Sequence, residues 1–127
     1  MPTPQETIAA YFAAIRRKDA AAWVACFAPD GVAFDPAHAP ERRGDDAHRA
    51  FFDGVAGLFA ELDFREGEAF ICGDRAAVPF SARCLAHSGR TAQVAGIDVF
   101  RFDADGRMLS VEGYWDPAPL FAAAGPA

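Results

Sequence analysis

The spacing of apolar residues predicts helices in the first half of the chain. A helical repeat begins just after Thr3-Pro4-Gln5-Glu6, a segment with the form of a capping box and with proline in the first turn. The repeat consists of Ile8, Tyr11, Phe12 and Ile15. We expect this first helix to end near Arg17.

Two further helices are expected before residue 60. Asp19 can cap a short helix over residues 20–27, which ends before Pro29. Asp30-Gly31 then predicts a turn, and residues 32–35 a short strand. Residues 36–44 form a loop with two prolines. Asp45 can cap the third helix, whose apolar stripe is Ala47, Ala50, Phe51, Val55, Leu58 and Phe59.

After Glu61 the pattern changes to extended segments separated by short turns with glycine. The expected strands cover residues 62–68, 69–72, 75–86, 91–102 and 107–115. Helices followed by consecutive strands predict an α+β domain, with an antiparallel sheet that carries the helices on one face. We expect the tail after Pro117 to be loosely held.

Length and composition fit one domain over residues 1–127, with 52% apolar residues and 12 phenylalanines. So much apolar surface favours a pocket, a dimer interface or both. The net charge of −6 and the scattered basic residues make nucleic acid an unexpected partner. No leader or membrane span is recognised, which favours a cytoplasmic protein.

Motifs for cofactors and metals are not found in the sequence. Cys26, Cys72 and Cys84 fit neither a disulfide framework nor a zinc site, and we interpret them as buried reduced thiols. The histidines lack metal spacing, no glycine-rich nucleotide loop follows a strand, and no serine lies in a nucleophile elbow. We therefore expect a protein without metal or cofactor.

Three polar residues break the apolar pattern. Asp98 shares a strand face with Val94, Gly96, Phe100 and Phe102. A buried carboxylate is costly unless it is paired, so Asp98 either pairs with Arg75 or Arg83 across the sheet or takes up a proton and acts as a donor.

Tyr11 and Asp35 are less unusual by themselves. Tyr11 lies on the apolar stripe of the first helix, where a core tyrosine bonded to a backbone carbonyl is the simpler interpretation. Asp35 ends a strand directly before Pro36, and Asp-Pro is an ordinary turn former. A carboxylate that faces a cavity from a strand end could instead be a general base.

At these residues the sequence resembles bacterial ketosteroid isomerase (steroid delta-isomerase), in the nuclear-transport-factor-like or SnoaL-like superfamily. The likeness spans nearly the whole chain. Three segments carry it: residues 11–15 with Asp19, residues 30–36, and residues 97–103 continued through Gly106-Arg107 to Tyr114-Trp115. The resemblance implies a cone-shaped fold, in which three N-terminal helices pack on a curved, mainly antiparallel sheet.

The resemblance also implies the chemistry. Asp35 would be the base that moves a proton along a 3-oxo-delta-5-steroid, and Tyr11 and a protonated Asp98 would donate hydrogen bonds to the oxygen that becomes an enolate. The reaction would need no cofactor, and the ligand would be a hydrophobic ketone. The expected pocket wall consists of Phe52, Val55, Leu58, Val94, Phe100, Val111, Gly113 and Trp115.

The chain also departs from the family. Some members carry tyrosines hydrogen-bonded to the catalytic tyrosine, and Phe27 and Phe52 stand at those places here. Alternative hypotheses are an enzyme that enolises another hydrophobic ketone, a related cyclase or hydrolase, and a non-catalytic binding module. A homodimer is expected, because Ile97, Val99 and Tyr114 would face outward from the sheet.

Overall fold

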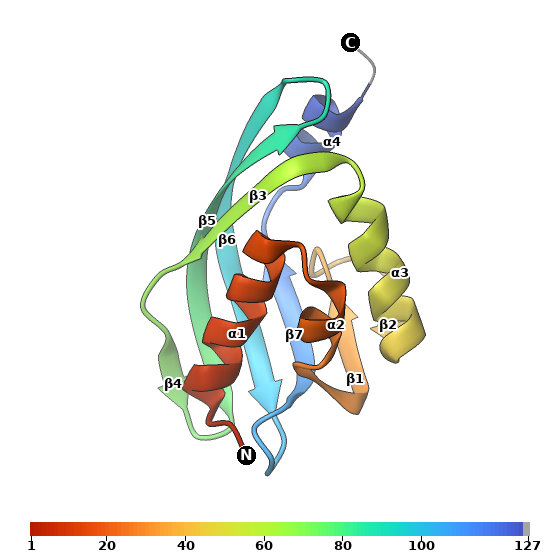
Figure 1. Ribbon diagram of the computed structural model, residues 1–127. Coiled ribbons are helices and arrows are strands. Elements are labelled where there is room, and N and C mark those ends of the chain that lie inside the picture. Colours follow the sequence, from red (N-terminus) through yellow and green to blue (C-terminus); the bar gives the residue numbers. More distant parts are fainter. Residues whose placement is uncertain (126–127) are drawn as a thin grey trace.

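The structure, a computed structural model, describes residues 1–125 and shows a mixed α+β fold (Figure 1). Within these residues, helices and strands follow one another in a less segregated order than the sequence pattern predicts. The elements are α1 (Pro4–Arg17), α2 (Ala20–Val24), β1 (Phe27–Phe34), β2 (Arg42–Arg43), α3 (Asp45–Ala56), β3 (Phe59–Glu66), β4 (Phe70–Cys72), β5 (Arg75–Ala86), β6 (Thr91–Phe102), β7 (Met108–Tyr114) and α4 (Ala118–Ala124).

All the strands belong to one curved sheet. The strand order is β2-β1-β7-β6-β5-β3, and β4 pairs with β5. The β1–β7 pair is parallel and the other pairs are antiparallel. Figure 1 shows α1 crossing in front of the sheet, α3 beside β1 and β2, and α4 at the far end of β5 and β6. The concave face therefore has helices around it on several sides.

The first helix is anchored at both ends. At its start, Thr3 and Glu6 form the predicted capping box, and Thr7 Oγ1 donates to Gly106 O at 2.6 Å. At its end, Arg16 Nη1 donates to Phe64 O at 2.7 Å and Lys18 Nζ donates to Phe59 O at 2.6 Å. The basic residues after the apolar repeat thus fix α1 to β3, so that the apolar stripe of the helix faces the sheet.

The expected boundaries between residues 20 and 35 are wrong. The second helix ends at Val24, and β1 already begins at Phe27 and runs through the expected Asp30-Gly31 turn. The reason lies in the pairing of β1 with β7, which shifts register between Phe27 and Val32. A Cβ at Gly31 would lie 2.7 Å from Met108 O, so glycine allows the close approach of these strands rather than a turn.

Three smaller expectations also change. The third helix begins at Asp45 itself, with Gly44 as its N-cap, and Phe59 belongs to β3 instead of the helical stripe. Cys72 is exposed, whereas Cys26 and Cys84 are buried. The end of β6, in contrast, has the predicted alternation, with Asp98, Phe100 and Phe102 buried.

The segment after Pro117 is ordered up to residue 125, contrary to the expected loose tail; residues 126–127 lie outside the described part of the chain. It forms α4, in which Leu120 and Ala123 are buried. The β5–β6 turn holds this helix, because Ser88 Oγ donates to Ala123 O and Arg90 Nη1 donates to Ala122 O, both at 3.2 Å. The C-terminal segment is thereby placed against β5 and β6.

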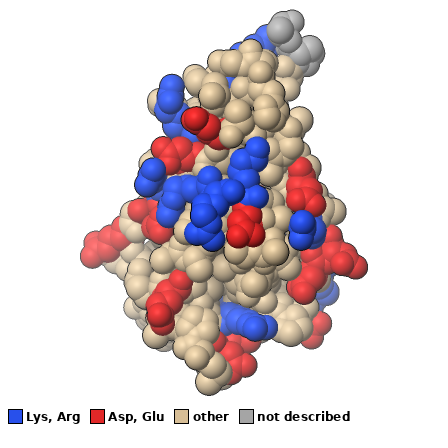
Figure 2. All heavy atoms as spheres, viewed as in Figure 1, with Lys and Arg blue, Asp and Glu red and all other residues tan. Residues whose placement is uncertain are grey.

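Charges of both signs share the surface. On the face shown in Figure 2, Lys and Arg side chains lie beside Asp and Glu side chains. Ion pairs at this charged surface include Arg16–Glu66 at 2.9 Å and Arg65–Asp63 at 2.6 Å. Within residues 1–125, no helix has the length and hydropathy needed to cross a membrane.

Candidate active site

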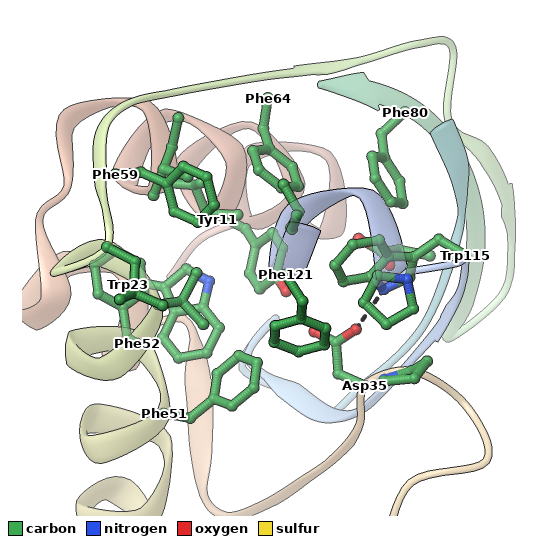
Figure 3. A pocket seen from close by; sticks show the side chains of 18 residues that line it. Tyr11, Trp23, Asp35, Phe51, Phe52, Phe59, Phe64, Phe80, Trp115 and Phe121 are labelled. Atoms are coloured by element: carbon green, nitrogen blue, oxygen red, sulfur yellow. Dashed lines mark hydrogen bonds between the residues drawn. The ribbon is translucent and has the colours of Figure 1, made fainter. Parts of the chain in front are cut away.

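An apolar cavity lies between the concave face of the sheet and the helices around it (Figure 3). The space free of protein atoms is about 910 Å³, and part of it is open to solvent. Half of the residues in its wall are aromatic. The aromatic residues that line it are Tyr11, Trp23, Phe51, Phe52, Phe59, Phe64, Phe80, Trp115 and Phe121.

Three lining residues carry ionisable groups, and they are Tyr11, Asp35 and Asp98. They come from α1, from the position directly after β1, and from β6. Close in space though far apart in sequence, all three are electrostatically coupled, since the charge of Asp35 raises the pKa of both other groups. The fold therefore brings the three predicted polar residues to the wall of one cavity.

Asp98 is the less exposed of the two carboxyl groups. Only 6% of the residue is exposed, and neither Arg75 nor Arg83 pairs with it: Arg75 contacts Asp74, and Arg83 lies opposite Gln93. Burial, and then the charge of Asp35, raise the pKa of Asp98 well above its usual range. The interpretation as a cross-sheet ion pair is wrong, and the protonated form, which can donate a hydrogen bond, is favoured.

Tyr11 is buried in an aromatic cluster. Its ring makes edge contacts with Phe12 and Phe100 at centroid distances of 5.2 and 5.3 Å. Burial raises the pKa of Tyr11 well above its usual value, and the charges of Asp98 and Asp35 add to this. The phenol therefore keeps its proton and has it available for a partner in the cavity.

Asp35 is held by Trp115, which directly follows the neighbouring strand β7. Trp115 Nε1 donates to Asp35 Oδ1 at 2.6 Å, the bond drawn dashed in Figure 3. Burial raises the pKa of Asp35, while the Trp115 N–H and the charge of Arg42 lower it. Of the two carboxyl groups, Asp35 is thus the one with stabilising partners for its ionised form.

Gly113 makes room for this bond. A Cβ at Gly113 would lie 2.6 Å from Asp35 Oδ1 and 2.9 Å from Trp115 Nε1. Gly113 is also the residue of β7 that faces Asp98 of β6 in the sheet register. Because directly opposed residues of antiparallel strands have closely spaced Cβ positions, the two carboxyl groups occupy neighbouring places on the concave face.

The Arg42 side chain packs against two aromatic residues of the cavity wall. The Arg42 guanidinium lies 3.9 Å from the Phe51 ring centroid and 5.6 Å from that of Trp23. Its Nε donates to His48 Nδ1 at 3.0 Å, and His48 Nε2 lies 2.9 Å from Gly31 O. His48 must then carry its proton on Nε2 and be neutral, in agreement with a pKa that burial lowers.

Only part of the expected pocket wall lines the cavity. Phe52, Val55, Leu58 and Trp115 line the cavity, whereas Val94, Phe100 and Val111 are buried in the core and Gly113 lies beneath the Asp35–Trp115 bond. The residues that sequence reasoning missed include Trp23 and Phe51 from the helices, and Leu120 and Phe121 from α4. The sequence carried no usable signal for them: a tryptophan on an apolar helix face is ordinary, and α4 was hidden by its alanine-rich composition.

The fold and this site define a class of small α+β proteins with a curved sheet and a polar trio on the wall of an apolar cavity. Residues 8–111 match the SnoaL-like domain family, and the chain belongs to that family. The resemblance found in the sequence is thereby confirmed at the level of the family.

Individual proteins with a similar sequence or fold are also found. A steroid delta-isomerase of Nocardioides simplex is 32% identical over 114 residues, which cover 89% of each chain. An NTF2-like protein of unknown function from Burkholderia pseudomallei has a TM-score of 0.82 and 26% identity, over 99% of this chain and all of the other. Rv0760c of Mycobacterium tuberculosis, solved with estradiol-17beta-hemisuccinate, shares the fold with a TM-score of 0.82 and 23% identity, over 93% of this chain and 98% of that one.

Proposed function

We propose that the protein is a cofactor-free isomerase that moves the C=C bond of a 3-oxo-delta-5-steroid into conjugation with the ketone. The observation that carries this proposal is the meeting of Tyr11, Asp35 and Asp98 on the wall of one apolar cavity. The identity to a steroid delta-isomerase supports it.

The environments of the Asp35 and Asp98 carboxyl groups differ in a way that suits the roles of base and acid. Asp35 has an N–H donor and a nearby cation, both of which favour its carboxylate. Asp98 has neither, and its raised pKa favours the neutral acid. Environments that separate the pKa values of two carboxyl groups assign them the roles of base and acid, as the resemblance to ketosteroid isomerases implies.

The proposed reaction is a proton transfer between two carbons of the same substrate. The Asp35 carboxylate takes the proton from the carbon between the ketone and the double bond, and the electron pair moves onto the ketone oxygen to give a dienolate. Tyr11 and protonated Asp98 donate hydrogen bonds to that oxygen. Asp35 then returns the proton two carbons further along, which leaves the conjugated ketone and restores the carboxylate.

The surroundings favour this charge movement. Donors fixed in a cavity with apolar walls stabilise the developing oxyanion without reorganising solvent. Asp35 is partly exposed, but it lines the cavity and is surrounded by protein on its other sides, so its charge is poorly solvated before the reaction. Aromatic side chains from α2, α3, β3 and β5 offer flat apolar surface for a fused-ring ligand.

The test is a rate measurement with a delta-5-3-ketosteroid, in which the conjugated product is followed by its ultraviolet absorbance. Asp35→Asn keeps the shape of the base and removes its ability to take a proton, so it should abolish turnover. Asp46→Asn is the matched control, because Asp46 is exposed on α3 and does not line the cavity; it should leave the rate unchanged.

The remaining outcomes separate the alternatives. No rate above background, or an Asp35→Asn variant as active as the parent, refutes the proposal. Binding of a phenolic steroid without turnover of the ketosteroid would instead favour enolisation of another hydrophobic ketone. A biological activity that survives Asp35→Ala would favour a binding module.

A further inference from the structure

Two buried side-chain nitrogens in residues 1–125 lack a hydrogen-bond partner, Trp23 Nε1 and Arg42 Nη2. Both belong to the same corner of the molecule, since the Arg42 guanidinium lies near the Trp23 ring. Buried N–H groups are nearly always paired in native proteins, so an unpaired one calls for an explanation. For Trp23 the explanation is found in the cavity that it lines.

Trp23 is fixed in place by packing. The residue is 2% exposed, and its ring lies 5.0 Å from that of Phe52 and 5.2 Å from that of Phe27. It also contacts the ring of Tyr11, at a centroid distance of 5.7 Å and an interplanar angle of 39°. The indole is therefore a rigid donor held beside the phenol, and Figure 3 shows it at the same end of the cavity as Phe52.

Tyr11 in turn has capacity for a donor. A phenol can donate one hydrogen bond and accept others. If its proton goes to the oxygen of a ligand, its own oxygen remains an acceptor inside an apolar cluster. The places where some ketosteroid isomerases carry supporting tyrosines hold Phe27 and Phe52, which have no hydroxyl. Both phenylalanines pack directly against Trp23.

We propose that Trp23 is a positioning residue for Tyr11: its indole N–H donates to the phenol oxygen when that oxygen gains negative charge, either as the phenol ionises or as it donates to the oxygen of a bound ligand. This inference deepens the proposed function and rests on the same site. Hydrogen bonds in a chain strengthen one another, so a phenol that accepts from an indole is a better donor. In the same sense, the Trp23 N–H lowers the pKa of Tyr11 against the larger effect of burial, which raises it.

The acidity of the Tyr11 phenol tests the inference without any substrate. The chain has two tyrosines, and Tyr114 is exposed on the outer face of β7. In a Tyr114→Phe background, position 11 is therefore the one tyrosine left. Biosynthetic replacement by 3,5-difluorotyrosine makes the phenol acidic enough to titrate in the folded protein by its absorbance or by fluorine NMR.

Two substitutions remove the donor. Trp23→Phe deletes the N–H together with part of the ring, and 3-benzothienylalanine at position 23 deletes the N–H while it preserves the shape of the indole. A hydrogen bond to the ionised phenol predicts an acid dissociation constant about 10- to 150-fold smaller in both variants than in the parent. Affinity for estradiol as a phenolic probe should fall less, about three- to tenfold, because Tyr11 stays neutral in that complex.

Each outcome decides the question. Equal phenol acidity in the parent and in the benzothienyl variant overturns the inference, and so does a change confined to Trp23→Phe, because that result would reflect packing alone. If the acidity changes as expected while the parent has no ketosteroid isomerase activity, the inference stands and the proposed function fails.

Discussion

Gly113→Ala should disable the base while the fold stays intact. The added Cβ would lie 2.6 Å from Asp35 Oδ1 and 2.9 Å from Trp115 Nε1, which are the two atoms of the 2.6 Å hydrogen bond. Both atoms belong to side-chain ends that can move aside. Gly113 also does not need a positive φ, so the backbone tolerates alanine. The accommodation separates Asp35 from Trp115.

The expected loss follows from the strength of that bond. A hydrogen bond to a charged group contributes about 1.5–3 kcal/mol, and about 1.4 kcal/mol corresponds to a factor of ten. The rate kcat/KM for the ketosteroid should therefore fall about 10- to 150-fold. Loss of the donor also raises the pKa of Asp35, so the acid limb of the pH–rate profile should move to higher pH.

The assay is the initial rate of isomerisation between mildly acidic and mildly alkaline pH, together with a thermal unfolding curve. Gly54→Ala is the matched control, because a Cβ at Gly54 in α3 meets no atom within 4 Å. It should leave the rate unchanged and stabilise the helix slightly. A Gly113→Ala variant with the parent's rate and pH profile would refute the idea that the Trp115–Asp35 bond holds the base.

Further expectations concern charge and assembly. Asp98→Leu removes a proposed oxyanion donor and should lower kcat about 10²- to 10³-fold, measured with the same ketosteroid. Asp98→Asn should raise the melting temperature at neutral pH and not at acidic pH: the folded pKa of Asp98 is raised, so its stabilisation is present at low pH and is lost as pH rises through that pKa. A variant that melts at the same temperature as the parent at both pH values would contradict this. Arg42→Met should move the acid limb of the activity profile to higher pH, because Arg42 lowers the pKa of Asp35; the exposed neighbour Arg43→Met is its control, and equal profiles would exclude the effect. We also propose a homodimer through the outer sheet face, where Ile97 is 46% and Tyr114 is 53% exposed; a monomeric mass by sedimentation at micromolar concentration would contradict it.

Periodicity and turn chemistry were sufficient to predict the first helix and the two longest strands. The repeat after Thr3 gave the first helix, and the strands over residues 75–86 and 91–102 have the expected ends. The errors have a common physical cause, which is that tertiary contacts decided the local conformation. Gly31 looks like a turn glycine, but the parallel pairing of β1 with β7 uses it for close approach.

Only part of the site was predictable, because the roles of several of its residues depend on tertiary contacts. Asp98 is out of place on its own strand, so the local pattern identifies it without any knowledge of the fold. Arg42 and Trp115 carry no such sign. Each acts on Asp35, which lies 7 residues from Arg42 and 80 residues from Trp115 in the sequence. Trp23 was equally silent, since an indole on an apolar helix face is ordinary until its N–H is found without a partner.

The residues of the cavity wall fall into two groups along the chain. The family match ends at residue 111, and Tyr11, Asp35 and Asp98 all lie inside it. Pro117, Leu120 and Phe121, which also line the cavity, come after it, and helix α4 is tied to the β5–β6 turn by Ser88 and Arg90. Evolution or an engineer could therefore exchange this C-terminal part of the wall, and with it the shape of ligand that is admitted, without altering the residues that are proposed to move the proton.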